Sequence, residues 1–154
     1  MQGELDGVAI SLFDYWYSTG GGRFSHVYDQ TVVILSLPTL SLPAFVLKPE
    51  NIFHKAGSAF GMQDIDFPEA PNFSKRSLLR GAQAQAIRAA FNPGVLDFFE
   101  RHEGMSAEGR GNHLIYYRAG RAQRPADIRG FMRQGCELAR LLVGLPPATT
   151  NPHQ

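Results

Sequence analysis

Two acidic residues separated by one position form the first candidate for a chemical site. Asp64 and Asp66 alternate with Ile65 and Phe67, so in an extended segment both carboxylates project to one side, with their α-carbons about 7 Å apart. Such a pair could hold Mg²⁺ or Ca²⁺, or divide into general acid and general base. His54 could join the two aspartates in a three-residue metal cluster. The same aspartates could instead accept hydrogen bonds from the backbone amides of a turn. The sequence alone leaves both interpretations open, a site for chemistry and a structural turn.

Three consecutive glycines, Gly20–Gly22, raise the alternative of a phosphate-binding loop. Such a loop leads its glycines into a helix and ends with Lys followed by Ser or Thr, or with a further spaced glycine. Here Arg23 is followed by a strand-like segment, and Gly-Lys-Ser/Thr occurs nowhere in the chain. We therefore expect the glycines to supply the positive φ angles of a hairpin turn. The histidines show no His-Glu-x-x-His spacing, and Gly-x-Ser-x-Gly is absent.

Arginine and tyrosine side chains form the second candidate, a surface for a partner or ligand. Arg129 and Arg133 are four residues apart, so they share one face of a helix. The residues that we predict to contact a partner are Tyr15, Tyr17, Arg23, Arg129, Arg133 and Arg140. The segments "SKRSLLRG" and "YYRAGRAQR" have a composition that suits RNA. However, the chain is almost neutral and its basic residues form no continuous stripe, so we expect no nucleic-acid binding.

The elements that position these residues begin with a long hairpin. Residues 7–17 and 24–37 alternate polar and apolar side chains, which is typical of strands, and "STGGGR" joins them. A short loop permits only antiparallel pairing. A third strand is predicted at 44–48 and a helix over 50–60, started by Pro49. Pro68 and Pro71 are expected to exclude regular structure before a short strand at 76–80.

The second half of the chain predicts more helix. Helices are expected over 82–91 and, capped by Asn92, from there to about His102. A second hairpin should join 105–108 to 113–118 through a turn at 109–112. The longest helix is predicted over 125–143, with an apolar stripe at helical spacing. The pattern predicts an α+β fold in which an antiparallel sheet built from hairpins packs against three to four helices.

The length of 154 residues suits one domain, which we place at 1–144, with a disordered C-terminal tail at 145–154. Cys136 is the single cysteine, so an intramolecular disulfide and a cysteine zinc cluster are excluded. Its helical neighbours predict a core residue. Residues 1–70 carry eight acids and three bases, whereas residues 110–154 carry seven arginines and two acids. This asymmetry could attract an anion or could pair the two ends of the chain.

Several ordered phrases resemble one family. These are "LFDYWYSTGGG", "LPAFVLKPENIF", "GMQDIDFPEAPNFSKRSLLRG", "FFERHEGMSAEGRGNHLIYYR" and the closing helix. They resemble an uncharacterised domain of bacterial proteins in which a pair of predicted membrane helices tends to precede the soluble region. The resemblance covers most of residues 7–143. It implies a membrane tether for the natural protein, with the soluble portion on one side of the membrane, and it supplies no activity. We expect the protein to be located in the cytoplasm or on the cytoplasmic face of the inner membrane.

The sequence contains many residues that are expected to form an apolar core, but no recognised catalytic motif. We expect a non-enzymatic interaction or ligand-sensing module, with a protein partner or a second copy of the chain and with no cofactor. The alternative is a metal-assisted hydrolase or phosphotransfer enzyme that uses Asp64, Asp66 and a histidine such as His54.

Overall fold

One antiparallel sheet organises the molecule. The structure, a computed structural model, describes residues 1–53 and 63–144. Within them, eight strands pair in the spatial order β1-β2-β3-β8-β7-β4-β6-β5. The strands are β1 (Gln2–Leu5), β2 (Val8–Thr19), β3 (His26–Ser36), β4 (Leu42–Pro49), β5 (Gln63–Asp64), β6 (Ser77–Gly81), β7 (Ser106–Gly111) and β8 (His113–Tyr117). The predicted α+β class with an antiparallel sheet is confirmed.

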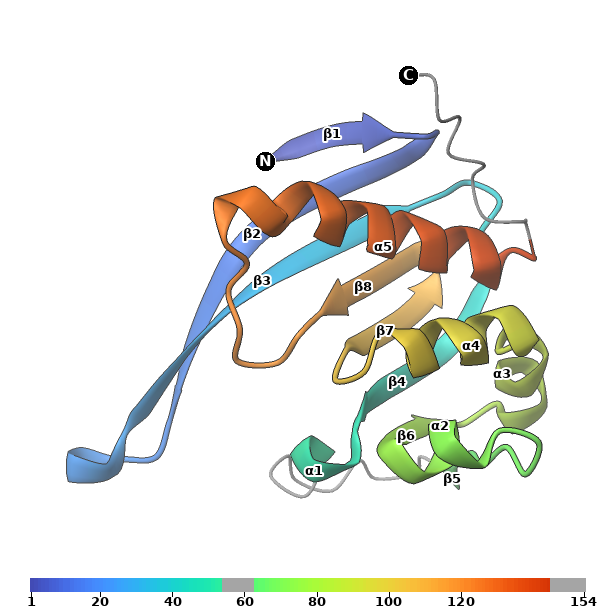
Figure 1. Cartoon of the computed structure of the whole chain (residues 1–154), viewed down its shortest axis with the longest axis horizontal. Coiled ribbons are helices and arrows are strands. Elements are labelled where there is room, and N and C mark those ends of the chain that lie inside the picture. Colours follow the sequence, from blue (N-terminus) through green and yellow to red (C-terminus); the bar gives the residue numbers. More distant parts are fainter. Residues whose placement is uncertain (54–62, 145–154) are drawn as a thin grey trace.

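The helices lie between and after the strands. The described part of the chain contains α1 (Glu50–Phe53), α2 (Pro71–Arg76), α3 (Ala84–Ala90), α4 (Pro93–Arg101) and α5 (Ile128–Leu142), with short 3-10 turns η1 (Gly22–Phe24) and η2 (Pro125–Asp127). Helices α4 and α5 run across one face of the sheet (Figure 1). No helix of the described residues is both long enough and apolar enough to span a bilayer.

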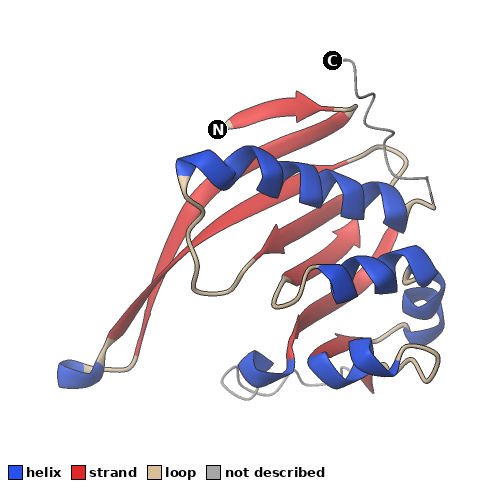
Figure 2. Cartoon of the chain, in the orientation of Figure 1, coloured by secondary structure: helices blue, strands red, loops and turns tan. Residues whose placement is uncertain are grey.

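The predicted first hairpin is confirmed, and it extends beyond the sheet. Strands β2 and β3 pair without a register shift from Ala9 opposite Ser36 to Thr19 opposite His26. Strand β8 pairs with β3 only from Val32 to Ser36. The remaining part, residues 13–31, therefore forms a two-stranded ribbon that projects away from the body and ends at η1 (Figure 2). We call residues 13–31 the arm.

The core lies between the sheet and the helices. The apolar alternation of β2 and β3 places Val8, Val33 and Leu35 in it, all fully buried. Helix α5 crosses β3 so closely that a Cβ on Gly135 would lie 3.0 Å from Leu35 Cδ1. Cys136 is buried in the same layer, as predicted. Burial raises the pKa of its thiol to about 11.

Helix α4 begins with the capping residue that the sequence predicts. Asn92 Oδ1 accepts a hydrogen bond from the backbone N–H of Val95 at 3.2 Å, and Pro93 occupies the first turn of α4. The predicted cap is therefore confirmed. The long C-terminal helix is also present, as η2 followed by α5.

Four local predictions differ from the structure. Strand β1 was not predicted; it pairs with β2 through the two-residue turn Asp6-Gly7, where both φ angles are positive. Pro71 does not exclude regular structure but starts α2, because proline is tolerated in a first helical turn. The second hairpin turns at residues 111–112, since Arg110 already pairs with His113. Five helices are described instead of three to four. Of the helix predicted over 50–60, residues 54–60 lie outside the described residues, as does the predicted tail.

Candidate functional site

The acidic pair occupies an exposed edge of the sheet. Asp64 lies in β5 and Asp66 follows it; both are exposed, while Ile65 between them is buried, so the predicted alternation holds. Arg80 Nε donates to Asp64 Oδ1 at 2.5 Å, and Arg88 donates to the backbone oxygen of Asp66. His54 lies outside the described residues. Among the residues that are described, no three His, Cys, Asp or Glu side chains gather into a metal-binding group.

The predicted tyrosines line one face of the arm. Tyr15 stacks on Tyr17 with ring centroids 5.9 Å apart, and Tyr17 stacks on Tyr28 of the neighbouring strand at 5.2 Å. The structure thus brings Tyr15 and Tyr17 together. Arg23 lies in η1, at the tip of the arm.

The arm carries an unusual concentration of exposed apolar side chains. In the described part of the chain, the large hydrophobic residues that are exposed are Met1, Phe13, Tyr15, Trp16, Phe24 and Val27. All except Met1 belong to the arm. The exposed fraction reaches 70% for Trp16 and 81% for Phe24. Because strand side chains alternate, Tyr15 and Trp16 project to opposite faces, so the arm presents apolar surface on both.

A groove of about 550 Å³ lies at the base of the arm. Its aromatic lining consists of Tyr17 and Tyr28 from the arm and Tyr117 from β8, and Ile52 of α1 also lines the groove. Tyr117 is buried, and its hydroxyl donates to Glu108 Oε2 at 3.1 Å. Burial, with the neighbouring Glu108 carboxylate, raises the pKa of the Tyr117 phenol far above its usual value. The groove therefore combines aromatic surface with a buried Tyr117 hydroxyl that stays neutral.

The arginines predicted on the last helix form a surface apart from the arm. Arg129 and Arg133 line a pocket of about 370 Å³ with residues of β1. Arg140 lies farther along the helix, and its Nε atom is buried without a hydrogen-bond partner among the described residues. The arm projects away from the body while α5 lies across the sheet (Figure 1). The two predicted groups thus do not meet in one surface.

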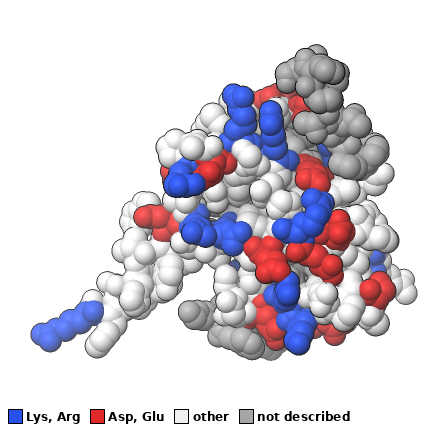
Figure 3. Space-filling view, in the orientation of Figure 1, with Lys and Arg blue, Asp and Glu red and all other residues white. Residues whose placement is uncertain are grey.

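A second arginine cluster was not predicted as a site. Residues 118–124 link β8 to η2, and with the start of α5 they line a pocket of about 640 Å³. Its charged residues are Arg118, Arg121, Arg124 and Asp127. Basic side chains gather on this face over the N-terminal end of α5 and the loop that leads into it (Figure 3). The sequence segment "YYRAGRAQR" covers this loop, but the spacing of its arginines along the chain does not show that their side chains line one pocket.

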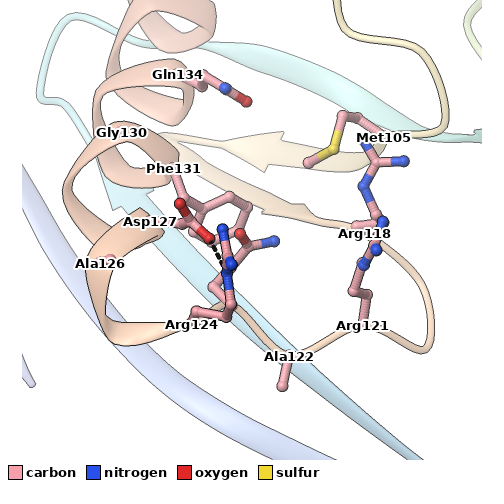
Figure 4. A pocket seen from close by; sticks show the side chains of 11 residues that line it. Met105, Arg118, Arg121, Ala122, Arg124, Ala126, Asp127, Gly130, Phe131 and Gln134 are labelled. Carbon is pink, nitrogen blue, oxygen red and sulfur yellow. Dashed lines mark hydrogen bonds and ion pairs between the residues drawn. The ribbon is translucent and has the colours of Figure 1, made fainter.

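The pocket has a defined geometry. Figure 4 shows the guanidinium groups of Arg118 and Arg121 on one side and Arg124 with Asp127 on the other. Arg124 Nε donates to Asp127 Oδ2 at 2.7 Å, and this hydrogen bond raises the pKa of the Arg124 guanidinium. Phe131 and Met105, both buried, also line the pocket.

Comparison with protein-family models, with curated proteins and with solved structures found no match to this chain. The function is therefore inferred from the surfaces that its own residues form.

Proposed function

We propose that the protein is a non-enzymatic interaction module that binds a protein partner through its arm and the groove at the base of the arm. The observation that carries this proposal is the placement of the exposed apolar side chains. Five of the six lie on the arm, within the described residues. Exposed apolar surface concentrated in one place marks interaction sites in soluble proteins.

The structure of the arm supports a binding role over a packing role. A two-stranded hairpin is at best marginally stable in water by itself. Here the pairing of β2 with β3 continues from the arm into the body, which fixes the register of the arm. The stacked rings of Tyr15, Tyr17 and Tyr28 cover one face of it. Trp16 and Phe24 contribute little to the core because they are exposed. Tryptophan and tyrosine are also the residues that are enriched in the centres of protein interfaces.

The groove extends the proposed interface onto the body. Its walls of Tyr17, Tyr28 and Tyr117 offer aromatic surface adjoining the arm. A partner that covers both would bury apolar side chains without unfolding any element of this chain. We further propose, on the resemblance to the bacterial domain family, that the chain acts as the soluble part of a membrane-associated protein. The metal-enzyme alternative is not proposed, because the Asp64 carboxylate is already paired with Arg80.

Site-specific photo-crosslinking tests the proposal. A photoreactive phenylalanine analogue replaces Phe24 at the tip of the arm in the cells from which the sequence derives. We expect a discrete crosslinked protein, which mass spectrometry identifies as another protein or as a second copy of this chain. The Trp16→Ser substitution in the same chain should reduce the yield strongly, since it removes the largest exposed ring of the arm.

The matched control places the analogue at Glu100, an exposed residue of α4 on the body. Position 100 should not give the product formed at position 24. The same products from both positions, or no product from position 24, would contradict the proposal. Crosslinking of position 24 to lipid alone would also contradict it, because the arm would then be a membrane contact. Sedimentation velocity of the purified chain reports self-association independently.

A further inference from the structure

We propose that the pocket between residues 118–124 and the start of α5 binds the phosphate group of a small phosphorylated molecule. This inference does not depend on the interaction proposed for the arm, because the arginines and Gln134 that would contact the phosphate belong neither to the arm nor to the groove beside it. Its basis is a rigid loop that holds three arginines around one cavity of about 640 Å³.

A tight turn places the first two arginines side by side. The backbone N–H of Arg121 donates to the carbonyl oxygen of Arg118 at 3.2 Å, and Gly120 between them has a φ of 68°. Glycine adopts this left-handed conformation without steric cost. The turn therefore brings the start of the Arg118 and Arg121 side chains to the same edge of the pocket, where Figure 4 shows both guanidinium groups.

Hydrogen bonds to strand β3 hold this loop in place. The backbone N–H of Gly120 donates to Gln30 Oε1 at 3.1 Å, and the N–H of Gln123 donates to Thr31 Oγ1 at 2.7 Å. The N–H of Thr31 in turn donates to the carbonyl oxygen of Arg121 at 3.2 Å. Gln30 and Thr31 are both buried. A loop fixed by three such hydrogen bonds keeps its arginines positioned before a ligand arrives, which lowers the entropic cost of binding.

The charges in the pocket are not balanced internally. Arg124 is paired with Asp127, the one acidic residue of the lining. Arg118 donates only to the carbonyl oxygen of Glu103 at 3.0 Å, and that oxygen carries no full charge. Within the described residues, the Arg121 guanidinium has neither a hydrogen bond nor an ion pair. Two positive charges therefore remain available for an anion.

Two glycines contribute to the geometry of the pocket in different ways. A Cβ on Gly104 would lie 2.6 Å from Arg118 Nη1, so glycine here allows the guanidinium its position. A Cβ on Gly130, in the first turn of α5, would meet no atom within 4 Å, so this part of the pocket is open. The N-terminal end of α5 also adds partial positive charge on this side.

A neutral donor completes the lining. Gln134 Oε1 accepts a hydrogen bond from the Tyr116 hydroxyl at 3.1 Å, which leaves the Gln134 amide N–H groups to donate elsewhere. Gln134 lines the same pocket. Planar guanidinium groups bind phosphate through paired hydrogen bonds, and a pocket of several hundred Å³ suits a small molecule. The chemistry points to a phosphate ester, either free in solution or as the headgroup of a lipid.

Calorimetric titration of the full chain with sodium pyrophosphate at low ionic strength tests the site. We expect saturable binding to the wild-type protein that weakens about tenfold in Arg121→Gln, through loss of one charge-assisted contact. Arg121 is exposed, and it has no partner among the described residues that would be lost, so this variant should fold normally. The matched control is Arg110→Gln, which removes the same charge from the exposed β7–β8 hairpin. Binding to this control should change less than twofold.

The outcomes separate the sources of the phosphate and decide the proposal. Binding of pyrophosphate or glycerol phosphate that depends on Arg121 supports a soluble ligand. Binding only to vesicles that contain phosphatidic acid, and not to phosphatidylcholine vesicles, supports a lipid headgroup if Arg121→Gln abolishes it. Equal losses in Arg121→Gln and Arg110→Gln would overturn the proposal, because net charge alone would explain them. Absence of binding to pyrophosphate and to both vesicles would overturn it as well.

Discussion

Thr31 donates a hydrogen bond from its hydroxyl to Asp14 Oδ1 at 2.7 Å, where the arm leaves the body. The same hydroxyl oxygen accepts from the backbone N–H of Gln123 at 2.7 Å. One fully buried side chain thus connects the two strands of the arm to the loop of the arginine pocket.

Replacement of Thr31 by valine should therefore affect both stability and the pocket. Valine keeps the shape but leaves the Gln123 N–H and the Asp14 carboxylate without this partner. We expect the free energy of unfolding in urea to fall by about 1–3 kcal/mol. Thr19→Val, at an exposed position of β2, is the matched control and should change it by less than about 0.5 kcal/mol. Equal stability of the two variants would refute the structural role of Thr31.

Substitution of the exposed rings of the arm should leave the fold intact. Trp16→Ser combined with Phe24→Ser removes apolar surface that faces solvent, so the free energy of unfolding should stay within about 1 kcal/mol of the wild type. Phe91→Ala, in the core, should cost about 3–5 kcal/mol. Thermal and urea unfolding compare the three proteins. A large loss in the arm variant would show that these rings pack within the chain rather than serve a partner.

Gly109 is required by close packing rather than by backbone conformation. It pairs with Phe45 across β7 and β4, and a Cβ there would lie 2.3 Å from Phe45 Cε1. Gly109→Ala should destabilise the protein by about 1–3 kcal/mol through overpacking. Gly3→Ala serves as control, since a Cβ on Gly3 meets no atom within 4 Å. Urea denaturation measures both, and a neutral Gly109→Ala would contradict the register of β4 and β7.

His102 should make the protein less stable in mild acid. Burial lowers the pKa of its imidazole below 6.5, and its Nε2 atom is buried without a hydrogen-bond partner among the described residues. The neutral ring is therefore favoured in the folded state. As pH falls below 6.5, the unfolded chain takes up a proton that the folded chain resists, so stability declines.

The test compares unfolding free energies at about pH 7.5 and about pH 5.5. His102→Gln should show a smaller loss between the two values than the wild type. His26→Gln, at an exposed position in the arm, should lose as much stability as the wild type. If both substitutions gave the wild-type pH profile, His102 would not be the group responsible.

Cys136 should react slowly with thiol reagents while the protein is folded. Its pKa of about 11 lies above the ordinary value of 9.0, because burial disfavours the thiolate. At pH 8 this alone lowers the thiolate fraction about a hundredfold. Modification by a chromogenic disulfide reagent should accelerate sharply in urea. The same shift predicts that stability declines as pH rises from 9 toward 11. Rapid modification of the native protein would contradict the burial of this thiol.

The first hairpin was predictable because its signals are local. The period-two alternation of residues 7–17 identifies a strand and its two faces, and the glycines that follow identify the turn. Asn92-Pro93 identifies a helix start from local sequence in the same way. Strand β1 was missed although Asp6-Gly7 is a strong hairpin signal. Its four residues, mostly exposed, show no apolar alternation of their own. Pro71 was misjudged because proline both ends and begins regular structure.

The arginine pocket could not be predicted from the sequence alone. Arg118, Arg121 and Arg124 lie in a loop without periodicity, so no pattern shows which way their side chains point. The hydrogen bonds that fix this loop come from Gln30 and Thr31, about ninety residues earlier in the chain. The tyrosines of the arm were predictable as a group, since alternation places Tyr15 and Tyr17 on one face. These tyrosines project beyond the sheet because β8 pairs with only part of β3. The local sequence of the arm does not show where that pairing ends.

The uninterrupted ladder between β2 and β3 has a mechanical consequence. Each residue pair from Thr19–His26 to Ala9–Ser36 is joined to the next without a bulge, so a displacement of the tip at η1 would be transmitted along both strands to Thr31. The backbone N–H of Thr31 donates to the carbonyl oxygen of Arg121, and its hydroxyl oxygen accepts from the N–H of Gln123. The position of the arm is thereby coupled to the loop that carries the arginine pocket.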